Sequence, residues 1–259
     1  MRKALAAILA AVLLAGSVCA GLWLAGFYFQ GQEQGMKMEA LRRLAASPIV
    51  TDIGQGPQET PLPGNRQKER EAPTMQHDFT ALQAENPECI GWVSIPGTEV
   101  DFPVMQSQDK PEFYLDHDFS RKYDIYGLPF LDARCSLDSG NLLVYGHHMN
   151  DGSMFSCLHE YQDKEYWQAH QEVVFETPAG AESYRIVAVL RVKGSYKASE
   201  WSIFRCLDVD NQEAQEIAAR RLYGTAVGIG PGDKLLTLVT CEYSQVNGRL
   251  AVVAAKEGG

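Results

Sequence analysis

The chain has 259 residues, 45% of them hydrophobic, and a formal charge of -10. This length and apolar content suffice for one well-packed domain with an appended segment. The acidic balance argues against partners such as nucleic acid or anionic lipid headgroups, and it is typical of a domain that stays soluble outside the cell.

A candidate membrane anchor lies at the start of the chain. Residues 4–29 carry no charged side chain. As a helix rising about 1.5 Å per residue, this run crosses a hydrocarbon core of ~30 Å. Arg2 and Lys3 precede it, so the positive-inside rule places residues 1–3 in the cytoplasm and the rest of the chain outside. Without these two cations the charge is -12.

Two processing alternatives compete with a retained anchor. Val18-Cys19-Ala20 resembles a signal-peptidase site, but the apolar run continues to Phe29, which is longer than an ordinary signal peptide requires. Cys19 also fits lipid attachment, but Val18 before it is not the small residue that such sites usually carry. We therefore expect an uncleaved, single-pass signal-anchor.

Residues 30–77 read as a juxtamembrane segment and linker. Residues 36–46 (MKMEALRRLAA) have helix-forming composition, and residues 47–76 contain five prolines and three glycines. The folded domain is expected to occupy residues 78–259.

Short strands dominate the expected elements of this domain. Asp78 is a candidate cap for a helix that begins at Phe79 and ends before Pro87. Further helical stretches are expected at residues 113–119, 154–160, 164–170 and 210–223. Strands are expected at residues 90–95, 100–105, 127–131, 142–145, 173–176 and 184–192, with two more within 235–254. This pattern predicts a mainly antiparallel β-barrel with helical insertions.

The six cysteines do not form a dense framework. They are dispersed and include no CxxC pair, so neither a disulfide scaffold nor a structural zinc site is expected. The sequence does not decide whether one disulfide forms among Cys89, Cys135, Cys157 and Cys206.

Three residue types that support nucleophilic catalysis stand where strands meet loops. Cys241 ends the apolar run LLTLVTC, and Arg249 follows eight residues later, nearly opposite it in a short hairpin. His147 follows Tyr145-Gly146 at the end of another apolar run. A lone cysteine in an apolar strand is usually a buried hydrophobe. Here the run stops at the cysteine, and a neighbouring cation favours the reactive thiolate.

The histidines allow two other interpretations. His148 competes with His147 as the proton carrier, because adjacent residues of an extended chain point to opposite faces. His147, His148 and His159 are also candidate metal ligands, but their spacing matches no common zinc arrangement. We therefore expect no metal.

Several motifs together resemble class B sortases. Residues 237–241 (TLVTC) match the family's TLxTC motif, and His147 and Arg249 hold the positions of its histidine and arginine. Residues 92–106 (WVSIPGTEVDFPVMQ), FYLDHDF and YGHHMNDGSMF add class B character. The resemblance spans residues 79–254, with His148 as a local departure.

This resemblance implies an eight-stranded sortase barrel and a membrane-anchored cysteine transpeptidase of Gram-positive-type bacteria that needs no cofactor. Cys241 would be the nucleophile, His147 the general acid and base, and Arg249 the group that stabilises the oxyanion. Thr240, Glu242 and Tyr243 would contact substrate. The implied partners are surface proteins that carry a C-terminal sorting signal, and an amine of peptidoglycan precursor or a pilin lysine.

The sorting signal itself stays open. An NPxTx-type signal is expected from the resemblance, with SPxTx and LPxTx as alternatives, and residues 193–210 would line the pocket. An L,D-transpeptidase fits less well because the pair before Cys241 is Val239-Thr240 rather than an SHGC-type motif. A papain- or NlpC-like peptidase would have the cysteine before its histidine. A tethered binding domain without turnover would not require Cys241.

Overall fold

The computed structural model describes residues 2–46, 76–193, 206, 210–224, 229–244 and 246–257. The chain divides into two compact units, Met1–Arg43 and Leu44–Gly259. The expected linker at residues 47–76 lies outside the described residues except for Gln76. Most of the expected pocket-lining segment at residues 193–210 also lies outside them.

Helix α1 (Arg2–Ala45) runs without a break from the apolar segment into a charged one. Among the described residues it is the single helix long and apolar enough to cross a membrane. Its charged part carries ion pairs one helical turn apart, Lys37 with Glu33 at 3.2 Å and Arg43 with Glu39 at 3.0 Å. Such pairs each add a few tenths of a kcal/mol to an exposed helix, about 0.3–0.5. Together with the helix-forming composition of residues 36–46, they favour continuation of the helix beyond its apolar residues.

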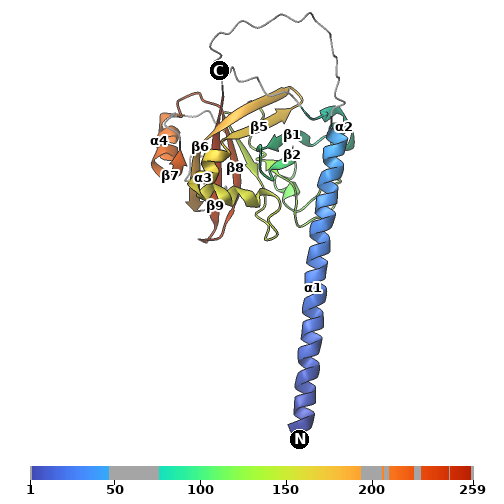
Figure 1. Cartoon of the computed structure of the whole chain (residues 1–259). Helices are drawn as coiled ribbons and strands as arrows, with labels where there is room; N and C mark the ends of the chain where they lie inside the picture. Colours follow the sequence, from blue (N-terminus) through green and yellow to red (C-terminus); the bar gives the residue numbers. More distant parts are fainter. Residues whose placement is uncertain are drawn as a thin grey trace, which may run out of the picture. The chain divides into compact units, whose positions relative to one another are not determined.

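The second unit is a closed β-barrel (Figure 1). In the described residues the strand order is β5-β1-β2-β3-β4-β8-β9-β6, with β7 added outside β6, and a further pairing of β5 with β6 closes the ring of eight. The strands are β1 (Cys89–Ser94), β2 (Asp101–Met105), β3 (Phe130–Leu131), β4 (Asn141–Tyr145), β5 (Glu172–Thr177), β6 (Gly180–Lys193), β7 (Arg221–Gly224), β8 (Leu235–Glu242) and β9 (Gly248–Lys256). The predicted eight-stranded barrel is thereby confirmed.

Helical insertions separate the strands, as the sequence predicts. They are α2 (Phe79–Glu85), the 3-10 helices η1 (Phe113–Leu115) and η2 (Phe155–Gln162), α3 (Lys164–Ala169) and α4 (Asn211–Arg220). The expected cap of α2 is confirmed, because an Asp78 carboxylate oxygen accepts the backbone N–H of Thr80 at 2.9 Å.

Three expected elements are shorter in the structure. The helical stretch predicted at residues 113–119 is only the 3-10 turn η1, which ends at Leu115. The helix predicted at residues 210–223 ends at Arg220, and its last residues form β7. Backbone hydrogen bonding to β6, with Ala188 opposite Gly224, outweighs the local helix propensity there. The strand predicted at residues 127–131 begins only at Phe130, because Gly127 has a φ of 55° and leaves the extended conformation.

The pairings of the barrel are mainly antiparallel, as predicted, with two exceptions that matter for the site. β2 pairs with β3 in parallel at one position, and β4 pairs with β8 in parallel along its whole length. β8 therefore lies between a parallel neighbour, β4, and an antiparallel neighbour, β9. Residues 235–240 of β8 are buried. Even the polar Thr237 is satisfied there, since its hydroxyl donates to Asn141 Oδ1 at 2.8 Å.

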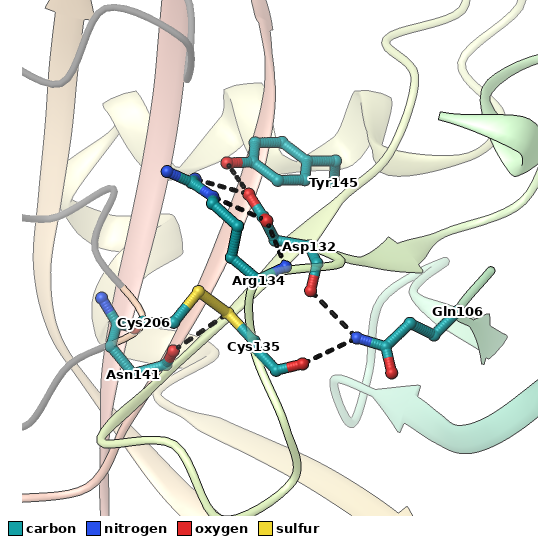
Figure 2. A network of polar contacts seen from close by, with 7 residues as sticks. All are labelled: Gln106, Asp132, Arg134, Cys135, Asn141, Tyr145 and Cys206. Carbon is teal, nitrogen blue, oxygen red and sulfur yellow. Dashed lines mark hydrogen bonds and ion pairs between the residues drawn. A yellow bond between two sulfur atoms is a disulfide. The ribbon is translucent and has the colours of Figure 1, made fainter. Parts of the chain in front are cut away.

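One disulfide links distant parts of the barrel. Cys135, in the turn after β3, is bonded to Cys206, 71 residues further along the chain (Figure 2). Gln106 Nε2 donates to the carbonyls of Asp132 and Cys135 at 2.9 and 2.8 Å, so the same turn is also fixed to the end of β2. The sequence does not determine which cysteines pair, and the structure shows that Cys135 pairs with Cys206.

Candidate active site

Three neighbouring strands carry the residues that the sequence selects. β4 and β8 run in parallel with Tyr145 opposite Val239, and the N–H of Gly146 donates to the Val239 carbonyl at 3.0 Å. His147 lies two residues beyond Tyr145, and Cys241 lies two residues beyond Val239. Because the carboxyl ends of parallel strands meet at the same edge of a sheet, the histidine and the cysteine leave the barrel at one rim.

Arg249 joins this rim from the other side of β8. In the antiparallel pair of β8 and β9, Cys241 is directly opposite Arg249, which confirms the pairing expected from the hairpin. Directly opposite residues point to the same face of a sheet. Both side chains are half-buried, whereas their neighbours Thr240 and Leu250 are 2% and 0% exposed. His147, Cys241 and Arg249 thus follow one another along this rim, at the ends of neighbouring strands.

The environment of Cys241 differs from that of the other thiols in the domain. Burial raises the pKa of Cys89 to about 12, and burial also raises the pKa of Cys157. Cys241 is free and half-exposed. Its neighbour Tyr243 has a pKa that is raised by burial and by the nearby Cys241, with Arg249 acting in the opposite direction. Cys157 is half-exposed as well, so what distinguishes Cys241 among the described thiols of the barrel is its position at the end of β8, beside Tyr243 and opposite Arg249.

His147 is oriented by a backbone carbonyl. Its Nε2 lies 2.7 Å from the carbonyl oxygen of Leu115, the last residue of η1. A carbonyl only accepts, so Nε2 carries the hydrogen and Nδ1 is the nitrogen with the free electron pair in the neutral ring. Gly146 before it is required by close packing: a Cβ there would lie 2.5 Å from the Phe155 ring. Phe155 also donates its N–H to the His147 carbonyl at 2.9 Å.

Two further imidazoles surround the backbone of Cys241. His159 Nε2 lies 2.8 Å from the Cys241 carbonyl oxygen, and His148 Nδ1 lies 3.4 Å from it. The two rings are 4.0 Å apart. Burial, and then repulsion by His159, lowers the pKa of His148, although its hydrogen bond to Cys241 acts in the opposite direction. Both rings therefore contact the carbonyl of Cys241.

From the sequence, His159 is a candidate only as a metal ligand. The structure assigns it a different contact: Gln162 Nε2 lies 3.2 Å from its Nδ1, so the ring accepts from Gln162 and donates to Cys241. No spacing rule links η2 to the end of β8, since 82 residues separate His159 from Cys241. Only the closed barrel brings them together.

The three residues expected to contact substrate differ in exposure. The Thr240 hydroxyl donates to the Gly146 carbonyl at 2.9 Å, and its side chain is buried. Glu242 is 4% exposed and accepts from the N–H and hydroxyl of Ser244 at 3.0 and 2.8 Å. Burial opposes its ionisation, but the Ser244 hydrogen bonds lower its pKa. Tyr243 is 67% exposed. Of the three, only Tyr243 presents its side chain to solvent, and their substrate contacts stay predictions.

Comparison with known proteins agrees with this geometry. Residues 93–257 match the family model described as the Sortase domain. Sortase B of Listeria monocytogenes serovar 1/2a is 31% identical over 183 residues, which are 69% of this chain and 73% of that protein.

Solved structures of sortase B are also similar to this chain. The Clostridium perfringens enzyme has a TM-score of 0.64 at 27% identity, covering 70% of this chain and all of that one. A Staphylococcus aureus sortase B–substrate complex has a TM-score of 0.61 at 27% identity, covering 69% of this chain and 83% of that one. With its TLVTC strand, its barrel and these matches, the chain belongs to the sortase family of cysteine transpeptidases, within class B.

Proposed function

We propose that this chain is a membrane-anchored transpeptidase that cleaves a C-terminal sorting signal of the NPxTx type after threonine. It would transfer the new acyl group to an amine of peptidoglycan precursor and so attach surface proteins to the cell wall. The observation that carries the proposal is that His147, just beyond the end of β4, Cys241 on β8 and Arg249 on β9 follow one another along adjacent strands.

The first half of the reaction forms an acyl-enzyme. The Cys241 thiolate attacks the threonyl carbonyl carbon, and Arg249 donates hydrogen bonds to the oxyanion that develops. Backbone N–H groups near Cys241 and Glu242 would assist it. The C–N bond to the following residue then breaks, and protonated His147 gives its proton to the leaving amine. The product is a thioester on Cys241 and a neutral His147.

The second half of the reaction consumes this thioester. The acceptor amine attacks the thioester carbonyl, His147 takes its proton, and the C–S bond breaks to restore the thiolate. A new amide replaces the amide that was cleaved, so no nucleotide is required. Leu115 supports this role of His147, because its carbonyl keeps the Nε2 hydrogen in place and leaves Nδ1 to exchange protons.

The membrane arrangement is part of the proposal. Residues 1–3 would lie in the cytoplasm, residues 4–29 would span the membrane, residues 30–77 would act as juxtamembrane segment and linker, and residues 78–259 would form the extracellular catalytic domain. The uncharged run at residues 4–29 within α1 supports it, together with the two cations before this run.

The test uses the full chain in detergent with a matched Cys241→Ala variant. Both are incubated with NPxTx, SPxTx and LPxTx peptides plus an amine acceptor, and mass spectrometry identifies the products. We expect cleavage after threonine with transfer to the amine by the wild type only. A thiol-reactive probe is applied in parallel, and an inert Cys241 would refute the nucleophile assignment.

A pilin-polymerising activity is the second candidate, because the same chemistry accepts a lysine side chain as the amine. An assay that offers a pilin-type lysine peptide and a peptidoglycan-type acceptor in competition distinguishes the two. Preferential transfer to the lysine peptide would move the assignment to pilus assembly.

A further inference from the structure

The carbonyl of Cys241 lies beyond the end of β4. In the described pairing of β4 with β8, the last opposed residues are Tyr145 and Val239, and the Val239 carbonyl accepts the N–H of Gly146 at 3.0 Å. Carbonyls two residues apart in a strand point to the same side, so the Cys241 carbonyl faces the place where β4 would continue. Its hydrogen-bond partner therefore comes from another element, and η2 supplies it.

His159 of η2 makes the shorter of the two imidazole contacts with this carbonyl. Its Nε2 lies 2.8 Å from the Cys241 oxygen, within the ordinary range of N–H···O hydrogen bonds, whereas His148 Nδ1 lies 3.4 Å away. Leu158 and Tyr161, on either side of His159 in η2, are both fully buried. His159 therefore donates to Cys241 from a helix that the core of the barrel holds in place.

A chain of hydrogen bonds determines which nitrogen of His159 donates. Arg191, on β6, donates through Nη2 to Gln162 Oε1. A guanidinium only donates, so Gln162 presents its oxygen to Arg191 and its Nε2 to His159 Nδ1, 3.2 Å away. Nδ1 of the ring accepts from this amide, and the hydrogen on Nε2 faces Cys241. Each group in the chain thus leaves the next one a single role.

Arg191 also contacts the residue that follows Cys241. Its Nε lies 3.9 Å from Oε1 of Glu242, which is 4% exposed and accepts from the N–H and the hydroxyl of Ser244. Burial opposes ionisation of Glu242, but the Ser244 hydrogen bonds, and then Arg191 and His159, lower its pKa. Arg191 is therefore linked to β8 at two successive residues.

We infer that His159 is a positioning residue for the nucleophile, with its ring oriented by Gln162 and Arg191. This role rests on the proposed function and deepens it, since it requires that Cys241 attacks the sorting signal. The bond to the Cys241 carbonyl replaces a strand partner and keeps the thiolate aligned with the threonyl carbonyl carbon. The His159 imidazole itself touches no reacting atom. A displacement of about 1 Å costs on the order of 10²-fold in rate, so one backbone hydrogen bond at this place is sufficient to control turnover.

Two substitutions separate this hydrogen bond from the packing of the ring. His159→Leu removes the donor, and His159→Gln keeps an N–H donor in the place of Nε2. In the full chain in detergent, His159→Leu should lower kcat for the sorting-signal peptide about 10–100-fold with KM almost unchanged, and His159→Gln should retain most of kcat. The control is His170→Leu, because the His170 ring makes a contact of the same kind with the Tyr166 carbonyl, at 3.1 Å. Equal losses in both His159 variants, or a change in KM alone, would overturn the inference.

A substitution at Gln162 tests the direction of the chain. Gln162→Glu keeps the acceptor for Arg191 but places a second acceptor opposite His159 Nδ1, so the ring makes both bonds only as an imidazolium. The ratio of kcat for Gln162→Glu to kcat for the wild type should therefore fall as the pH rises from about 6 to about 8. Besides the thiol itself, the titratable or charged groups that face the ring among the described residues are His148, Glu242 and Arg191, and all are the same in both proteins. A ratio that does not change with pH would overturn the inference.

The hydrogen bond can also be observed without turnover. Cys241-Glu242 is the single Cys-Glu pair in the sequence, so ¹³C at the cysteine carbonyls and ¹⁵N in glutamate give one correlation, between the Cys241 carbonyl carbon and the Glu242 N–H. A carbonyl carbon that loses a hydrogen bond resonates upfield. We expect this upfield shift in His159→Leu and a much smaller one in His159→Gln. An unmoved resonance in His159→Leu would contradict the inference.

The outcomes separate the positioning role from the reaction. If the wild type cleaves no sorting-signal peptide, the proposed function fails and the positioning role fails with it. If the wild type cleaves the peptide, and His159→Leu keeps full kcat although its carbonyl resonance has moved, only the positioning role is rejected. Circular dichroism verifies the fold of each variant. If His159→Leu does not fold, the pH dependence of Gln162→Glu decides.

Discussion

The two sides of the Cys241 rim are built by different means. On the β8–β9 side, an unbroken antiparallel ladder from Leu235 opposite Ala255 to Glu242 opposite Gly248 determines which residues meet. On the β3–β4 side, β3 has only two residues, and side chains and a disulfide hold the turn beyond it. The first side depends on backbone register within one hairpin. The second depends on contacts between residues far apart in the sequence.

The largest expected effect is on the β8–β9 side. Arg249→Ala should lower the rate of sorting-signal cleavage about 10²–10³-fold, the usual cost of removing a donor to an oxyanion. It should leave the free energy of unfolding almost unchanged, because the hydrogen bond that Arg249 Nη1 makes is to the adjacent carbonyl of Gly248, at 2.8 Å. Steady-state kinetics and urea unfolding measure the two quantities.

The control for this prediction lies on the same strand. Lys256→Ala removes the ion pair with Glu182 at the other end of β9 and should keep full activity. If Arg249→Ala leaves cleavage intact, the guanidinium has no catalytic role. If the variant unfolds the domain, Arg249 acts on stability. Either result contradicts the prediction that the β8–β9 side supplies the oxyanion donor.

The disulfide is the strongest single support of the β3–β4 side. Replacing both Cys135 and Cys206 by serine releases a 71-residue loop and should lower the free energy of unfolding by about 2–4 kcal/mol. Urea unfolding measures the loss, and a reducing agent should bring the wild type close to the variant. Thiol labelling of Cys241 should stay as fast as in the wild type, because the hairpin register does not depend on this bond.

Cys19→Ser is the matched control for that experiment, since Cys19 is a free, exposed cysteine. An unchanged unfolding midpoint in the doubly substituted variant would show that hydrogen bonds alone hold the turn. Slower labelling of Cys241 would show that the two sides are not independent.

The smallest effect is expected at Asp132. Its pKa is lowered from the ordinary value of 3.8, with burial opposed by the bonds to Arg134. Its contribution to stability is therefore complete above the unfolded-state pKa and is lost as the pH falls through the lower folded-state value. Asp132→Asn should cost about 1 kcal/mol at pH 7, a modest figure because Arg134 is half-exposed.

The pH dependence identifies the cause of this loss. The difference between wild type and Asp132→Asn in urea unfolding should shrink as the pH is lowered below about 4. Asp138→Asn, at an exposed position outside this ion pair, serves as the control. A difference of the same size at pH 7 and at pH 3 would mean that packing of the side chain, rather than its charge, stabilises the turn.

Much of the β8–β9 side follows from the sequence alone. Two apolar runs separated by a short polar connection determine a hairpin, and the spacing of eight residues determines that Cys241 is opposite Arg249, because strand pairing is a local count. The apolar run at residues 4–29 likewise determines a helix by composition. The position of His147 also follows from the sequence, because a strand followed by glycine predicts where the imidazole leaves the sheet.

The remaining features required the tertiary structure. The parallel pairing of β4 with β8, the carbonyl of Leu115 on His147, and His159 on the Cys241 backbone all join segments at least 32 residues apart. The choice of Cys135 and Cys206 among the cysteines and the change from helix α4 to strand β7 were decided in the same way. Closing the barrel fixes which distant segments become neighbours, and that closure depends on the simultaneous burial of all eight strands, which no local pattern encodes.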